Sequence, residues 1–178
     1  DVLQLLGSPL PAHPGEAEVG AELQAAMAVL ASKGPDGVLA QPAASDPVVA
    51  ATMRIQSRVA SAAYFSRPML LPVLACRLVV ASATHGLSPA TPYALSVFGI
   101  VLNSLGLLRE AHTWGQVALA LVDRFEDRSL EARTRHVVHD LVCTWIVPLR
   151  GTLADLRRVV DIGRESGDLE YAGYAAHA

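Results

Sequence analysis

The chain has 178 residues, enough for one domain or two small ones with a substantial core. Its composition is 52% hydrophobic, 5% aromatic and 17% charged, and the charged share lies below the roughly 25% usual for soluble domains. A net charge of −3 without a run of Lys or Arg excludes the basic footprint of nucleic-acid binding, so we expect no nucleic-acid partner. The apolar residues are mostly Ala, Leu and Val, which favours closely packed helices with large buried faces.

The N-terminal stretch DVLQLLGSPLPAHPGE has no basic region followed by an apolar core, so it is not a secretory signal. It does not begin with Met, from which we expect a longer polypeptide. Cys76 and Cys143 lie in apolar helical stretches, which indicates buried thiols in a reducing cytoplasm rather than a disulfide. Residues 86–108 carry no formal charge and are long enough to cross a bilayer. Their prolines, glycines and polar residues favour a buried helix instead, and we expect no membrane insertion.

Helical periods fill the chain, and strand signals are nearly absent. An irregular proline-rich segment comes first, and a helix follows over about 16–32 and ends at Gly34-Pro35. A linker over 34–47 leads to the next helix, for which Ser45 or Asp46 is the expected cap. Later helices, each bounded by Pro, Gly or charged residues, are expected at about 47–65, 68–84, 89–105, 108–125, 129–146 and 152–166, with another beginning near 168.

Two expected helix junctions share a short sequence pattern, a glycine followed seven residues later by Tyr-Ala. In HGLSPATPYAL, Gly86 precedes Tyr93 by seven residues, and in SGDLEYAGYA, Gly167 precedes Tyr174 by seven residues. Gly86 is expected to end its helix as a left-handed C-terminal cap. Because alternate helices begin near 47, 89, 129 and 168, the helix pair recurs about every 40 residues, as in helical-repeat proteins.

This period predicts an all-α fold without β-sheet, a right-handed solenoid of tetratricopeptide-like (TPR-like) helical hairpins. An ordinary helical bundle, whose helices are also amphipathic, is the alternative. Residues 1–45 are then an entry segment, leading helix and linker, and residues 46–178 are the repeats, with the last helix truncated. Small and apolar residues at helical spacing are expected to pack the middle hairpin: Leu95, Phe98, Gly99, Leu102, Gly106, Ala111 and Ala118. Gly115 stands where the tetratricopeptide pattern has an aromatic residue.

The first helix of such a hairpin lines the concave face of a solenoid, where peptides bind. The expected binding stripe mixes polar and apolar side chains: Tyr93, Ser96, Ile100, Asn103 and Ser104. Trp114 and Trp145 are expected to be packing residues, whereas an exposed Trp would mark a partner surface.

Catalytic signals are weak. The stretch RHVVHDLVC places four possible metal ligands on one face of a helix at i, i+3, i+4 and i+7: His136, His139, Asp140 and Cys143. One straight helix does not easily enclose an ion, so a metal-dependent enzyme is only the rival hypothesis. The acidic pair Glu126-Asp127 lies at a helix start, where the helix dipole favours it. No kinase motif or phosphate-binding loop occurs, and we expect no catalytic residue, cofactor or metal in this segment.

The phrases LGSPLPAHP, HGLSPATPYALSVFGIVL and ESGDLEYAGYAAHA, in this order, resemble one family. It is the TPR-like middle region of large bacterial multidomain signalling proteins, and the resemblance spans about Leu6 to Ala176. Those proteins combine a serine/threonine kinase-like domain, an AAA/STAND-type ATPase, helical repeats, a GAF domain and a sensor histidine kinase.

The resemblance implies a non-catalytic, cytoplasmic scaffold for signal transduction through protein–protein interaction. Its implied partners are neighbouring domains of the same polypeptide or a separate peptide or protein, and any kinase or ATPase activity would lie in other domains. The alternative is a ligand-sensing repeat domain of a STAND-type ATPase transcription activator.

Overall fold

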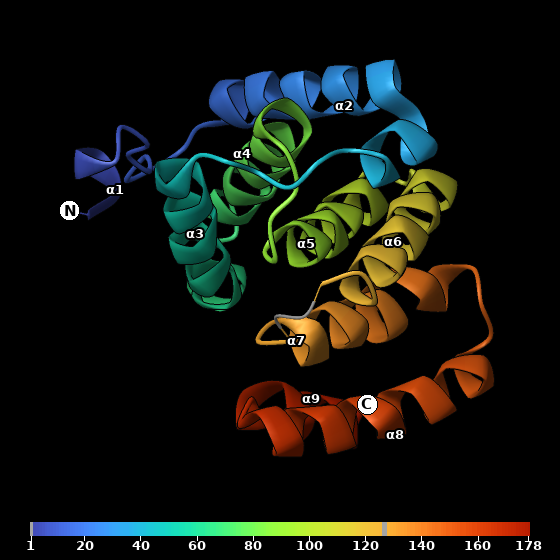
Figure 1. Ribbon diagram of the computed structural model, residues 1–178. Coiled ribbons are helices and arrows are strands. Elements are labelled where there is room, and N and C mark those ends of the chain that lie inside the picture. Colours follow the sequence, from blue (N-terminus) through green and yellow to red (C-terminus); the bar gives the residue numbers. More distant parts are fainter. Residues whose placement is uncertain (1, 126–127) are drawn as a thin grey trace. The chain divides into compact units, whose positions relative to one another are not determined.

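The computed structural model describes residues 2–125 and 128–178, and within them all regular structure is helical (Figure 1). These residues hold no strand, only one isolated bridge between Ala43 and Leu87. The all-α prediction is therefore confirmed. The acidic pair Glu126-Asp127, expected at a helix start, lies outside the described residues. None of the described helices combines the length and apolar character that a bilayer crossing requires.

The chain divides into two compact units, residues 1–94 and 95–178, and the boundary falls inside one helix. The first unit contains α1 (Val2–Leu5), α2 (Glu16–Leu39), α3 (Pro47–Ser66) and α4 (Leu70–His85). The dividing helix is α5 (Thr91–Ser104). The second unit contains α6 (Leu108–Val122), α7 (Glu131–His136), the π-helix η1 (Val137–Val142), the 3₁₀ turn η2 (Cys143–Trp145), α8 (Leu149–Ser166) and α9 (Leu169–His177). The boundary predicted between residues 45 and 46 stays a prediction.

Local sequence signals set several helix starts. Asp46 accepts a hydrogen bond from the Val48 amide at 2.8 Å, and Pro47 occupies the first turn of α3. The helices that open the expected pairs begin at residues 47, 91, 131 and 169, close to the predicted positions.

The expected linker begins later than predicted. Gly34 has φ 66° and ψ 171° and breaks the helix there, but helical structure resumes and continues to Leu39. Pro35 suits the first turn of the resumed helix, and Val38, 1% exposed, anchors it in the core. Only the stretch from Ala40 to Asp46 connects α2 to α3 without a helix.

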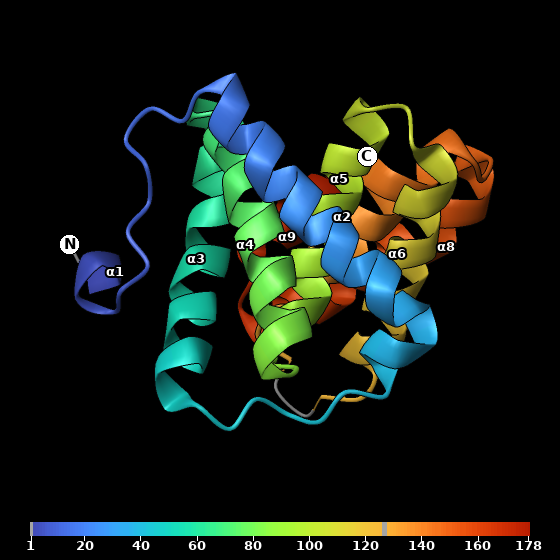
Figure 2. The ribbon, with the colours of Figure 1, turned by 90° about the horizontal axis from the view of Figure 1, so that it is seen from above.

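In the first unit, α4 packs against α2 and against α3, as both views of the ribbon show (Figures 1 and 2). Leu74, Cys76 and Leu78 of α4 are 0% exposed. The linker also contributes, because Gln41 donates from Nε2 to the Ala83 carbonyl near the end of α4 at 3.0 Å.

Gly86 ends α4 by a different geometry from the expected one. Its φ of 102° is positive, but its ψ of 171° is extended rather than left-handed helical. This backbone lets the chain lie beside the linker, where Leu87 donates to the Pro42 carbonyl and Ala44 donates to the Leu87 carbonyl. Gly167, with φ 79° and ψ 9°, is a left-handed cap, the geometry that was expected at Gly86. The two junctions therefore differ in structure.

In the second unit, α7, α8 and α9 pack against one another. A Cβ at Gly163 of α8 would lie 2.8 Å from the Ala172 Cβ of α9, so the two helices need this glycine to approach closely. The continuous helix predicted over 129–146 is wrong, because the segment changes from α to π to 3₁₀ geometry.

Candidate functional site

Six of the seven residues predicted to pack the middle hairpin are buried, and the seventh, Gly106, is exposed. Leu95, Phe98 and Leu102 are 1% exposed, and Ala111 and Ala118 are 0% exposed, whereas the glycines act through the backbone.

Gly99 and Gly106 serve the backbone in different ways. A Cβ at Gly99 would lie 2.9 Å from Val142 Cγ2, so glycine allows η1 to approach α5. Gly106 has φ +77° at the turn that follows α5. Gly115, which departs from the tetratricopeptide pattern, also faces η1, because its Cβ would lie 3.3 Å from Val142 Cγ1. Side chains of η1 occupy the space that the aromatic residue of the tetratricopeptide pattern would fill at position 115.

The expected concave stripe is not an open surface in this structure. Tyr93 is 2% exposed and Ser96 is 0% exposed, and Ile100 is half-buried. Ser104 is exposed but donates to the Val101 carbonyl at 2.7 Å. Most of the uncharged helix α5 is buried, and the binding role of these residues stays a prediction.

Asn103, the remaining member of the stripe, stabilises the irregular helix. Its Nδ2 donates to the carbonyls of Leu141 and Val142 at 3.1 and 3.2 Å. These carbonyls lie where the π-helix passes into the 3₁₀ turn and the regular helical bonding pattern changes. Asn103 therefore holds the end of η1.

The four possible metal ligands do not converge. His136 Nε2 lies 3.7 Å from Asp140 Oδ2, but His139 Nδ1 faces Asp155 of α8 at 3.6 Å. Cys143 accepts a hydrogen bond from Gln116 of α6 at 3.8 Å. The π-helix changes the angular spacing, so the predicted single face is wrong, and the described residues hold no group of three or more such side chains that fits a metal ion.

His136 packs in an aromatic cluster instead. Its ring lies 5.5 Å from that of Tyr171 and 5.8 Å from that of Tyr174, and the side chain is 5% exposed. Burial lowers the pKa of His136 below its ordinary value, with Asp140 acting in the opposite direction. The neutral ring is thus a packing residue of the α7–α9 contact.

Both cysteines are buried, as predicted, and both are free thiols. Burial, with the nearby Glu22 carboxylate, raises the pKa of Cys76 to about 12. Burial also raises the pKa of Cys143, while its hydrogen bond from Gln116 lowers it. Neither thiol has the electropositive, accessible surroundings that make a nucleophile.

An exposed apolar cluster covers the entry to α8. Trp145 is 66% exposed, Leu149 52% and Leu153 40%, and Ile146 beside them is 44% exposed. Leu149 and Leu153 lie one helical turn apart on the same face of α8. The prediction that Trp145 is a packing residue is wrong, whereas Trp114, 8% exposed, is in the core as predicted. We call Trp145, Ile146, Leu149 and Leu153 the α8 apolar surface.

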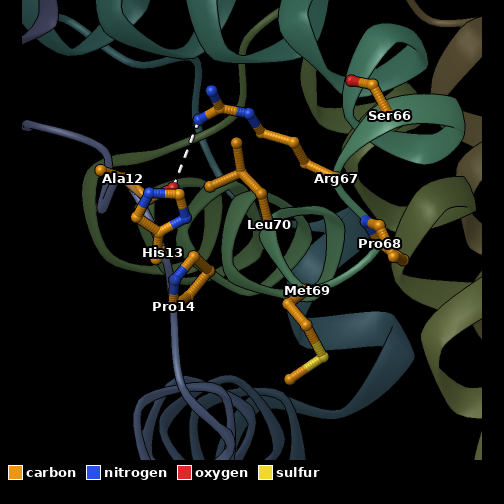
Figure 3. A pocket seen from close by; sticks show the side chains of 8 residues that line it. All are labelled: Ala12, His13, Pro14, Ser66, Arg67, Pro68, Met69 and Leu70. Carbon is orange, nitrogen blue, oxygen red and sulfur yellow. Dashed lines mark hydrogen bonds between the residues drawn. The ribbon is translucent and has the colours of Figure 1, made fainter.

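A second feature lies in the first unit, where the N-terminal segment crosses the junction of α3 and α4. Figure 3 shows Arg67 reaching across to the Ala12 carbonyl, with Leu70 beside it and His13 next to Pro14. Two hollows, of about 440 and 360 Å³, adjoin this contact, and Ala12, Ser66, Arg67 and Leu70 line both.

This contact was not predicted from the sequence. Arg77, which also contacts the segment, is the single charged residue in the apolar run LLPVLACRLVV, and that isolation was the available signal.

Comparison with known proteins identifies no relative: no family model, no curated protein and no solved structure matches the chain.

Proposed function

We propose that this chain is a non-catalytic helical interaction segment, in which TPR-like hairpins form a right-handed solenoid. The α8 apolar surface is the observation that supports this function best. Exposed Trp and Leu side chains gathered in one region are typical of protein–protein contacts, and Trp is enriched among the residues that dominate binding energy. The divergence of the possible metal ligands supports a binding role over the metal-enzyme hypothesis.

The occupant that we propose for this surface is an apolar helix face from a neighbouring part of the same polypeptide. Leu149 and Leu153 are spaced as one ridge of a helix, which suits ridge-into-groove packing by another helix. The resemblance to multidomain signalling proteins supports the same proposal, because their repeats lie between catalytic modules. The segment would then act in the cytoplasm by changing how those modules pack.

The test uses the natural polypeptide that contains this chain. A photo-crosslinking residue at Leu149 should capture a defined neighbouring segment, identified by mass spectrometry. Leu149→Asp together with Leu153→Asp should abolish that contact and change the output activity of the adjoining modules. Leu5→Asp is the matched control, because Leu5 is also an exposed leucine, 87% accessible, but lies in the first unit. An unchanged output together with no crosslink above the control would refute the proposal.

A further inference from the structure

Residues 8–14 of the chain lie on the first unit much as a bound peptide would. Gln56 of α3 donates from Nε2 to Ser8 Oγ at 2.9 Å. Arg77 of α4 donates from Nη1 to the Pro9 carbonyl at 2.8 Å, and Arg67 between the two helices donates to the Ala12 carbonyl at 3.3 Å. Three side chains that are distant from the segment in sequence therefore hold one short stretch.

Contacts outside the segment orient one of these donors, Arg77, whereas Gln56 is 2% exposed with the segment in place. The Arg77 guanidinium is oriented by Glu22 of α2, whose Oε1 lies 2.7 Å from Nε, and by Glu18, whose Oε1 lies 3.8 Å from Nη2. This ion pairing leaves Nη1 directed at the Pro9 carbonyl.

In the hydrogen bonds between these three side chains and residues 8–14, all the donors lie on one partner. All three side chains donate, and the segment SPLPAHP accepts. Proline has no N–H, so the three prolines at 9, 11 and 14 give the segment an excess of carbonyl acceptors over amide donors. These donors suit a proline-containing peptide, which accepts at its carbonyls and leaves fewer amide N–H groups without a partner.

We propose that the surface formed by Gln56, Arg67 and Arg77 is a binding site for a proline-containing peptide of a partner protein, which competes with residues 8–14 of this chain. The site belongs to the first unit, so the inference goes beyond the α8 apolar surface and does not depend on it.

The hollows around Ala12 define what the competing peptide carries. Ala12 and Leu70 line both hollows, with Met69 in the hollow drawn in Figure 3 and Val59 in the other. A large apolar residue in place of Ala12 fills this space, and no acidic residue lines either hollow. The chain's own segment is thus an incomplete ligand, and a partner with a bulkier residue binds more tightly.

The experiment measures fluorescence anisotropy of a labelled peptide with the sequence of residues 7–15, added to the full 178-residue chain. The peptide carrying Ala12→Leu is expected to bind saturably and about tenfold more tightly than the unaltered peptide, from the added apolar burial. Leu3→Asp in the protein removes a side chain that is 4% exposed and anchors the N-terminal segment, so it should raise the peptide's affinity. Equal affinities for the two peptides, or no saturable binding, would overturn the proposal.

Protein variants locate the site. In the Leu3→Asp protein, where the chain's own segment no longer competes, Arg77→Gln and Arg67→Gln are each expected to weaken peptide binding about tenfold, because each removes a charged donor to a carbonyl. Arg58→Gln is the matched control, since Arg58 is an exposed arginine on the same helix α3, and it should leave the affinity unchanged. Circular dichroism checks folding, and Arg67→Gln, at an exposed position, keeps the test valid if Arg77→Gln unfolds the chain. Binding that survives both substitutions, or that falls equally with Arg58→Gln, contradicts the site.

Discussion

Arg133 of α7 and Asp168, the residue before α9, form an ion pair with two hydrogen bonds. Nε lies 2.7 Å from Oδ2 and Nη2 lies 3.2 Å from Oδ1. Both side chains are largely buried, at 12% and 7% exposed, and the Arg133 guanidinium also lies 4.8 Å from the centre of the Tyr171 ring. Asp168, which directly follows the left-handed cap at Gly167, therefore ties the start of α9 to α7.

Asp168→Ala should strongly destabilise the second unit. It leaves the buried Arg133 guanidinium without its two-bond partner, and loss of one member of a buried pair costs about 3 kcal/mol. Glu170→Ala is the control, because Glu170 is 38% exposed and lies 3.6 Å from Arg133, and it should cost less than about 1 kcal/mol. Urea unfolding followed by circular dichroism measures both free energies. Equal losses of unfolding free energy would show that the Arg133–Asp168 pair stabilises the fold no more than the exposed Arg133–Glu170 pair does.

Gly86→Ala should be more damaging than Gly106→Ala, although both glycines have positive φ. A Cβ at Gly86 would lie 2.9 Å from the Pro42 carbonyl oxygen and 3.0 Å from the Ala44 nitrogen, which are backbone atoms that cannot turn aside. At Gly106 nothing lies within 4 Å, so only the backbone strain of about 1 kcal/mol remains. We expect Gly86→Ala to cost at least about 2 kcal/mol more in thermal or urea unfolding, from displacement of the linker. Equal costs would mean that the linker moves freely away from α4.

The contrast between these glycines shows what sequence alone can predict. The cap by Asp46 with Pro47 and the end of α8 before Gly167 follow from local chemistry and could be predicted from the sequence. The extended geometry of Gly86 depends on a linker more than 40 residues earlier, which no local pattern records.

The same reasoning applies to the candidate sites. The prediction that His136 and Cys143 share one face assumed a straight α-helix. The π-helix between them changes the angle by which successive residues turn about the axis. Trp145 looks like a core residue by composition, and only its position at the end of the 3₁₀ turn exposes it. Composition and period thus predict the helices, whereas the surfaces depend on tertiary packing.

Glu131 should make stability depend on acid pH. Its side chain is 3% exposed and accepts from Arg135 Nε at 2.8 Å and from Arg128. Burial alone would raise the pKa of Glu131, but the hydrogen bonds and charges of Arg128 and Arg135 outweigh it and hold the pKa below the ordinary value of 4.5. A lowered folded-state pKa stabilises the fold above pH 4.5, and this contribution is lost as the pH falls through the folded value.

Glu131→Gln should therefore destabilise the protein by about 3 kcal/mol at pH 7, and the difference from wild type should shrink as the pH falls below the ordinary Glu range. Asp161→Asn is the control at an exposed position of α8 and should leave the pH profile unchanged. Urea unfolding at a series of pH values from 7 to about 3 measures the difference. A difference that stays constant with pH would mean that Glu131 acts by packing and not through its charge.

The two tryptophans should behave in opposite ways. Trp145→Ala removes a side chain that is 66% exposed and should change the free energy of unfolding by no more than about 0.5 kcal/mol. Trp114→Ala opens a cavity in the core, where the side chain is 8% exposed, and should cost about 3 to 5 kcal/mol. Acrylamide quenching gives an independent measurement: the Trp114→Phe protein, which retains Trp145, should be quenched much more steeply than the Trp145→Phe protein. Shallow quenching of Trp145, or a large stability loss on its removal, would show that this residue packs within the chain, and it would remove the main support for the α8 apolar surface as a partner site.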